Sequence, residues 1–185
     1  MSTTTLILPG LSSSGPDHWQ SHWERADSTC VRVQQHEWEA PRCADWVLAL
    51  ERAVRGCDGD VVLVGHSSSC AMVAHWAHAT TAGMLARVRG ALLVAPSDPE
   101  GANYPAAPSG FAPVPLEALP FRSIVVASND DMYVSVERAR AYAAAWNSEF
   151  VDVGAAGHIN AASGHGPWPD GVALLNQLRQ PNDHQ

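Results

Sequence analysis

Apolar runs rich in β-branched residues recur along the chain and alternate with segments of helical spacing. A short, continuous apolar run is typical of a strand that is buried on both faces of a parallel sheet. The runs predict strands over 4–8, 30–33, 61–64, 89–95, 123–127 and 150–153. The pattern therefore places a parallel sheet of about six strands at the centre of the molecule.

Between these runs, apolar residues return every three or four positions, as on one face of a helix. The expected helices are one capped by Asp17, one over 44–54, one after the serines at 67–69, one from Ser135 through Trp146 and one over 172–178. Strands that alternate with helices predict an α/β fold with helices on both faces of the sheet. No repeat or linker divides the chain, so residues 1–185 are expected to form a single domain with a polar tail at about 180–185.

The segment 97–120 is rich in Pro, Ala and Gly and shows little periodicity. A loop of this length in a compact domain is usually functional or mobile. Two interpretations stay open for it, a small lid or binding loop and a plain surface connection.

Composition limits the partners of the protein. The chain has 11 Lys and Arg residues against 19 Asp and Glu, a net charge of −8, and its basic residues are scattered. Nucleic acids and anionic membranes are bound by clustered basic residues, so neither is an expected partner. No apolar run approaches the ~18 residues of a membrane helix, and the N-terminus lacks the positive charge of a secretory signal. With no CxxC pair, the four cysteines are expected to be free thiols, and we predict a cytoplasmic location.

The stretch 61–74 carries the strongest chemical signal. A buried strand runs into Gly65-His66-Ser67-Ser68-Ser69, and an alanine-rich helical segment follows. A strand that turns sharply into a helix, with a serine at the turn, is the geometry of a nucleophile elbow. Backbone N–H groups at such a turn can hold a developing oxyanion. We therefore expect Ser67 to be a nucleophile, with the N–H groups of Ser68 and Leu11 as oxyanion donors.

A serine nucleophile needs a base, and the base needs an orienting acid. His158 lies among small residues on the loop after the last predicted strand and is the best base candidate; His165 is its main rival. Asp131 is favoured over Asp130 as the acid, because it is followed by an apolar segment at the usual spacing. Sites of parallel sheets form where strands end, which is where all three side chains fall.

The remaining histidines suggest less. His66 flanks the nucleophile, and its side chain is expected to point away from the site. His18 and His22 are four residues apart and share one helix face, as zinc ligands can. No third ligand can be named for them, so no metal is expected. Trp19 and Trp23 on the same helix are expected to pack in the core.

Several motifs together resemble a known family. Gly65 to Ser69, the Asp loop and Gly157-His158 are similar to the α/β-hydrolase pattern. More narrowly, the chain resembles the small serine hydrolases related to the retinoblastoma-binding serine hydrolase and the bacterial YdeN-like proteins. The motifs that carry this resemblance are Pro9-Gly10 through His18-Trp19, His22-Trp23-Glu24, Asp45-Trp46, Gly157-His158-Ile159-Asn160, Ser163-Gly164 and Trp168. The resemblance covers nearly the whole chain and implies a reduced α/β-hydrolase fold without a large cap domain, a Ser67–His158–Asp131 triad and no cofactor.

One position departs from the family pattern. The usual elbow motif is G-x-S-x-G, and its last position here is Ser69. The missing glycine normally allows strand and helix to pack closely at a strained turn. Serine adds the smallest polar side chain, so the elbow is expected to be intact.

The expected function is hydrolysis of small ester, thioester or amide substrates through an acyl-enzyme on Ser67. The expected pocket is small and open, formed by the first loop, the segment 97–120 and the region near Trp168. The alternative is a catalytically idle scaffold that binds another protein, with some of the seven tryptophans as interface anchors. The choice between esterase and amidase and the oligomeric state stay open.

Overall fold

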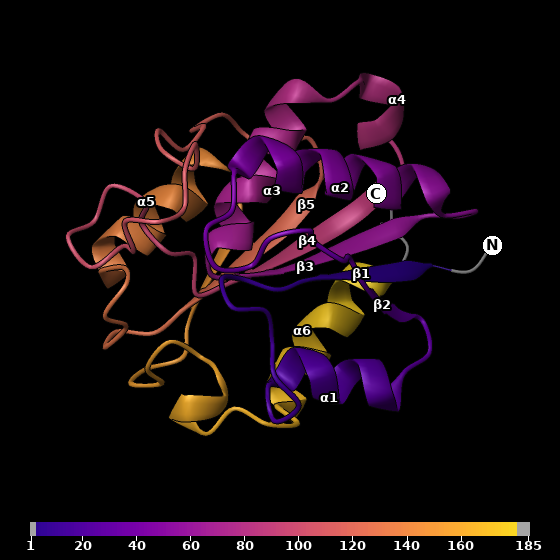
Figure 1. The fold of residues 1–185 in the computed structure, drawn as a ribbon. Coiled ribbons are helices and arrows are strands. Elements are labelled where there is room, and N and C mark those ends of the chain that lie inside the picture. The colour runs from indigo at the N-terminus through magenta and orange to yellow at the C-terminus, as the bar shows by residue number, and fades with distance from the viewer. Residues whose placement is uncertain (1–2, 181–185) are drawn as a thin grey trace.

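The computed structural model describes residues 3–180 and has one parallel sheet at its centre (Figure 1). The strands are β1 (Thr4–Leu8), β2 (Cys30–Arg32), β3 (Val61–His66), β4 (Val88–Val94), β5 (Arg122–Ala127) and β6 (Glu149–Asp152). Their order is β2-β1-β3-β4-β5-β6, and every neighbouring pair is parallel. The predicted α/β fold with a parallel sheet of about six strands is confirmed.

Helices cover both faces of this sheet. They are α1 (Trp19–Ala26), α2 (Cys43–Gly56), α3 (Ser68–Ala79), α4 (Ala82–Leu85), α5 (Val136–Ala145), α6 (Pro169–Arg179) and a 3₁₀ helix, η1 (Ala161–Ser163). In Figure 1, α2 and α3 lie on one face, and α1 and α6 lie on the other. The short α4 and η1 were not expected. Across residues 3–180 the structure has no large cap domain, and the predicted polar tail lies outside the described residues from 181 onward.

The strands are continuously apolar because both of their faces are buried. Leu6, Leu63 and Leu93 pack in the cluster shared by α2, α3 and α5. The alternate residues Ile7 and Leu92 pack in the cluster shared by α1 and α6. A two-sided core of this kind removes the apolar and polar alternation of a half-exposed strand.

The strand order places a crevice at the carboxyl ends of β1 and β3. From β1 the chain first moves outward to β2, and it then returns across the sheet to β3 on the other side of β1. The connections that leave β1 and β3 therefore diverge, and ligands of open α/β sheets bind at such a point. This edge of the sheet is where the predicted site residues come together.

The expected cap of α1 was wrong by one residue. His18, and not Asp17, precedes the helix in an extended conformation, and its Nδ1 accepts a hydrogen bond of 3.2 Å from the Gln20 N–H. A turn closed by a hydrogen bond from the His18 N–H to the Gly15 carbonyl delays the helix and leaves Asp17 exposed. The capping ring is buried and packs 5.3 Å from the Trp19 ring.

Ser69 fits the elbow in place of the usual glycine. Its side chain is fully buried, and its hydroxyl donates a hydrogen bond of 2.6 Å to the carbonyl of Pro9. Pro9 begins the loop after β1, so this hydrogen bond joins that loop to the first turn of α3. The departure from the usual motif thus adds a link between the two connections that flank the crevice.

We expect Ser69→Ala to lower the free energy of unfolding by about 1–3 kcal/mol, because the Pro9 carbonyl would lose its donor inside the protein. Urea unfolding followed by circular dichroism measures this change. The exposed hydroxyl of Ser12 provides the control, and Ser12→Ala is expected to stay within about 0.5 kcal/mol of wild type. Equal effects of the two substitutions would contradict the assigned role of Ser69.

The capping histidine makes stability depend on pH. Burial, aided by the charge of Arg32, lowers the pKa of His18 to about 4, whereas an unfolded histidine titrates near 6.5. Between these values the unfolded chain binds more protons than the folded chain, so stability falls as the pH falls from about 6.5 to about 4. His18→Asn retains a capping side chain that does not titrate and should flatten this slope. Urea midpoints measured from pH 7 to pH 4 test this pH dependence, and the exposed His78→Asn is the control. Parallel slopes for wild type and His18→Asn would refute the role of His18.

Candidate active site

The structure brings the three predicted side chains Ser67, Asp131 and His158 into one hydrogen-bonded chain. Nε2 of His158 lies 2.9 Å from Oγ of Ser67. Nδ1 of the same ring lies 2.8 Å from Oδ2 of Asp131. Ser67 and His158 both line a pocket of about 300 Å³ where the strands end. A chain of this kind can transfer a proton from a hydroxyl to an imidazole whose other nitrogen faces a carboxylate.

A strained turn presents Ser67 to this pocket. The residue directly follows β3 and directly precedes α3, with φ 59° and ψ −126°. Such a conformation is costly for a residue with a side chain and occurs mainly where the surrounding structure imposes it. Gly10, on the loop after β1, lies so close that a Cβ there would be 2.7 Å from Cβ of Ser67. Only glycine therefore allows that loop to approach the serine.

Asp131 is held by its own loop. Oδ1 of Asp131 accepts a hydrogen bond of 2.9 Å from the Tyr133 N–H, which leaves Oδ2 for His158. The neighbouring Asp130 points elsewhere, and its Oδ1 accepts hydrogen bonds from the Ser128 hydroxyl and from the Gly157 N–H. These bonds hold the pKa of Asp130 below its usual value. Asp130 thus fixes the turn before His158 and does not contact the ring.

Backbone contacts on both sides fix His158. Gly157 has φ 56°, and a Cβ there would lie 2.8 Å from Cβ of Ser163. On the other side, the indole N–H of Trp19 donates a hydrogen bond of 2.9 Å to the carbonyl of the buried Ile159. The ring of Tyr133 packs edge-on against the His158 ring, with 4.7 Å between the centroids. Together these contacts leave the imidazole little freedom to turn away from Ser67.

The expectation that His66 points away from the site was wrong. His66 lines the same pocket, and its ring centroid lies 4.8 Å from that of His158. As the last residue of β3, it follows Val62 and Val64 on the face that packs with α1, and that face opens into the pocket at the edge of the sheet. Its Nε2 lies 2.9 Å from the His158 carbonyl, which can only accept, so Nε2 carries the proton. Burial, reinforced by the nearby His158, keeps the pKa of His66 well below its usual value, and the ring is neutral.

Sequence reasoning also missed the position of His18. Its ring lies 4.8 Å from the His66 ring and lines the pocket. Within residues 3–180, Nε2 of His18 has no hydrogen-bond partner. The sequence drew attention to His18 through its spacing from His22 and its place in a family motif, and neither indicated a position beside the pocket. Among the described residues, no group of three or more His, Cys, Asp or Glu side chains is arranged to hold a metal ion.

The rival base His165 does not reach Ser67. Its Nδ1 lies 3.2 Å from the Ser163 hydroxyl, and its ring packs edge-on against Trp168. Trp168 is itself buried against Trp19 and Trp23 and does not line the pocket, contrary to expectation. The opposite wall comes from the segment 97–120, as expected, through Tyr104 and Pro105 among others.

The two backbone N–H groups expected to bind an oxyanion flank Ser67. Leu11 lines the pocket, and Ser68 is the first residue of α3. Across the described part of the chain, neither N–H donates a hydrogen bond to another residue. The hydroxyl of Ser68 pairs with that of Tyr104 at 3.0 Å, and this contact ties the 97–120 segment to the start of α3. Backbone N–H groups are the kind of donor that can stabilise a tetrahedral oxyanion.

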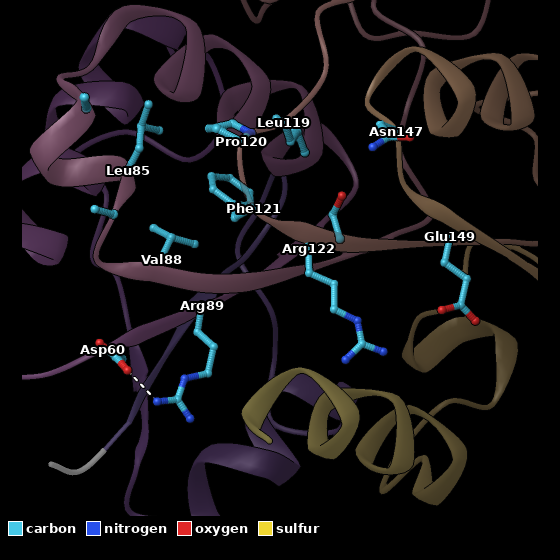
Figure 2. Close-up of a pocket in the computed structure, with 13 residues that line it drawn as sticks. Asp60, Leu85, Val88, Arg89, Leu119, Pro120, Phe121, Arg122, Asn147 and Glu149 are labelled. Atoms are coloured by element: carbon cyan, nitrogen blue, oxygen red, sulfur yellow. Dashed lines mark hydrogen bonds and ion pairs between the residues drawn. The ribbon is translucent and has the colours of Figure 1, made fainter. Parts of the chain in front are cut away.

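A larger hollow, of about 1070 Å³, lies at the opposite edge of the sheet, where β4 and β5 begin (Figure 2). Arg89 pairs there with Asp60, and Arg122 donates a hydrogen bond to the Gln177 carbonyl of α6. No histidine or cysteine from residues 3–180 lines this hollow. Ser67 and His158 therefore meet at the carboxyl edge of the sheet and not in the larger hollow.

Comparisons with known proteins show the family of the chain. The family model described as serine hydrolase matches residues 5–177. A YdeN-like hydrolase from Pectobacterium atrosepticum shares 36% identity and a TM-score of 0.83, over 96% of this chain and 91% of that one. A comparison with curated protein sequences gave no significant match.

More distant solved structures share the fold. The ydeN gene product of B. subtilis has 18% identity and a TM-score of 0.73, over 96% of this chain and 98% of that one. Esterase 2 of Thermogutta terrifontis has 17% identity and a TM-score of 0.66, over 95% of this chain and 81% of that one.

The first two matches cover nearly all of the chain, and one of them exceeds a third in identity. This protein belongs to the serine hydrolase family, in a small α/β-hydrolase form similar to the YdeN-like hydrolases.

Proposed function

We propose that this hydrolase cleaves small ester, thioester or amide substrates through an acyl-enzyme on Ser67. The observation that carries the proposal is the continuous hydrogen-bonded chain from Asp131 through His158 to Ser67 at the wall of an open pocket. The two hydrogen bonds that join Asp131, His158 and Ser67 do not exceed 2.9 Å, so no side chain has to move before proton transfer.

The proposed reaction has two halves. His158 takes the proton of Ser67 while Oγ attacks the substrate carbonyl, and Asp131 stabilises the imidazolium that forms. The N–H groups of Leu11 and Ser68 hold the oxyanion of the tetrahedral intermediate. His158 then protonates the leaving group, and it activates water in the same way to release the acyl group.

The pocket supports small substrates. Its volume of about 300 Å³ is at the lower end of the range of ligand pockets, which extends to about 1,000 Å³. Solved esterases of the same fold, among them Est1E of Butyrivibrio proteoclasticus with ferulic acid bound, support ester hydrolysis as the first activity to test. Est1E shares only 14% identity with this chain, so it gives no guidance on the acyl group.

The proposed partner is a small molecule, and the proposed location is the cytoplasm. All four cysteines are free thiols, as expected, and burial raises the pKa of Cys30 to about 11 and that of Cys43 to about 12. Free, protonated thiols agree with a reducing compartment. Among the described residues, no helix has the length and apolar character that crossing a membrane requires.

The alternative of an idle, protein-binding scaffold rested on exposed tryptophans. Six of the seven tryptophans are less than 9% exposed, and Trp38 is partly buried against the core. Residues that already pack inside the domain offer no anchors to a partner. We therefore do not carry this alternative further.

Labelling with a fluorophosphonate probe tests the nucleophile. We expect wild type to be labelled at Ser67 and Ser67→Ala to remain unlabelled, because the probe forms its bond with an activated serine. His158→Ala should be labelled at least about a thousandfold more slowly, since the hydroxyl loses its base. Ser68→Ala removes the adjacent hydroxyl but keeps the backbone N–H, and it should still be labelled. Undiminished labelling of Ser67→Ala would refute the proposed nucleophile.

Paired substitutions test the acid. Asp131→Asn is expected to lower kcat/KM for a p-nitrophenyl ester by about 10²–10⁴, because an amide favours the wrong tautomer of His158. Asp130→Asn keeps an oxygen for the Gly157 N–H and should stay within about tenfold of wild type. Steady-state kinetics of both variants measure the difference. An equal loss in the two variants would show that the carboxylate of Asp131 has no special role.

A further inference from the structure

The nucleophile has a second hydroxyl partner that the triad does not explain. Oγ of Ser97 lies 2.8 Å from Oγ of Ser67, and both side chains are buried. Ser97 lies three residues beyond the end of β4, the strand beside β3, and it lines the same pocket. It therefore touches the atom that would form and break the covalent bond.

The direction of this hydrogen bond follows from the protons available. A carboxylate only accepts, so Nδ1 of His158 carries the ring proton that faces Asp131. The lone pair of Nε2 then accepts the single proton of Ser67. In the contact between the two hydroxyls, Ser97 must be the donor and Oγ of Ser67 the acceptor.

The backbone around Ser97 is built to hold it there. Ala95 is fully buried and has φ 48°, a left-handed conformation that residues with a side chain rarely adopt. This turn directs Pro96 and Ser97 toward the elbow. One residue later, the Asp98 N–H donates a hydrogen bond of 3.0 Å to the Tyr133 carbonyl, and the Asp98 carboxylate accepts one of 2.9 Å from the Tyr142 hydroxyl. The segment is thereby fastened to the loop that carries Asp131.

We propose that Ser97 is a further catalytic residue, which donates a hydrogen bond to Oγ of Ser67 and acts chiefly in deacylation. The inference rests on the proposed acyl-enzyme function. In the free enzyme Oγ is a hydroxyl oxygen and already a good acceptor, so the hydrogen bond changes little as attack begins. In the acyl-enzyme Oγ is an ester oxygen, which is a poor acceptor. Only interactions that strengthen between ground state and transition state accelerate a step.

During deacylation the hydrogen bond from Ser97 to Oγ of Ser67 becomes stronger between ground state and transition state. Water loses a proton to Nε2 of His158 and attacks the acyl carbon, which gives a tetrahedral intermediate. The bond between this carbon and Oγ of Ser67 then breaks, and its electron pair goes to Oγ, which takes the proton back from His158. The hydroxyl of Ser97 stabilises the negative charge that develops on Oγ during this step. The free acid leaves, and Ser67 is a hydroxyl again.

The test separates the two half-reactions. Wild type and Ser97→Ala are acylated with p-nitrophenyl acetate, the ester is removed, and loss of the acetyl group from Ser67 is followed by intact mass spectrometry. Deacylation of Ser97→Ala should be about tenfold to a hundredfold slower, the effect of one hydrogen bond to a charged group. The acylation rate, read from kcat/KM, should change less than about threefold, so kcat and KM fall together.

Two further variants serve as controls. Ser97→Thr retains the hydroxyl and should restore deacylation. Ser123→Ala removes one hydroxyl from another hydroxyl pair, the buried Ser123 with the partly buried Ser148 at 2.6 Å, where β5 begins, and should leave both rates unchanged. Unchanged deacylation in Ser97→Ala, or an equal fall of kcat and kcat/KM, overturns the role of Ser97 alone. A wild type that never forms an acetyl-enzyme overturns the proposed function together with it.

Discussion

The approach of the loop after β1 to the turn after β3 is the contact on which the site depends. Gly10 leaves room for Ser67, and the hydroxyl of Ser69 holds the carbonyl of Pro9. Without the first, the loop and the serine would collide; without the second, the Pro9 carbonyl would lose its donor. The position of the Leu11 N–H follows from both. The proposed oxyanion donors depend on this rigid support, because backbone N–H groups have no rotamers with which to adapt.

A layer of neutral aromatic groups supports the other half of the site. His18, His66 and Trp19 pack against one another below the His158 loop. Hydrogen bonds from His66 and Trp19 reach the carbonyls of His158 and Ile159. Burial keeps His18 and His66 uncharged at neutral pH, so they add no positive charge beside the His158 imidazole. The same side chains therefore support the His158 loop and leave its surroundings without added positive charge.

The sequence was informative wherever a pattern of residue types dictates the geometry. Continuous apolar runs predicted the strands because both sheet faces are buried, and a serine between a strand and a helix predicted the elbow. The positions of His66 and Ser97 were not predictable in this way. His66 lies on the face of β3 that packs with α1, and the opening of that face into the pocket depends on tertiary packing. Ser97 follows a turn with a positive φ at Ala95, and no glycine marks this turn in the sequence. The two adjacent carboxylates, Asp130 and Asp131, differ only in the direction in which the loop turns them.

The residues that meet at the pocket come from distant parts of the chain. Leu11 follows the first strand, Ser67 the third, Ser97 the fourth, and His158 lies beyond the last. Contacts of such large sequence separation form late in folding, because long loops must close before these contacts contribute any stability. A partly folded chain can therefore hold several strands in register and still lack the contact between Ser67 and His158. Activity of this protein would report that the last strand has docked and that folding is complete.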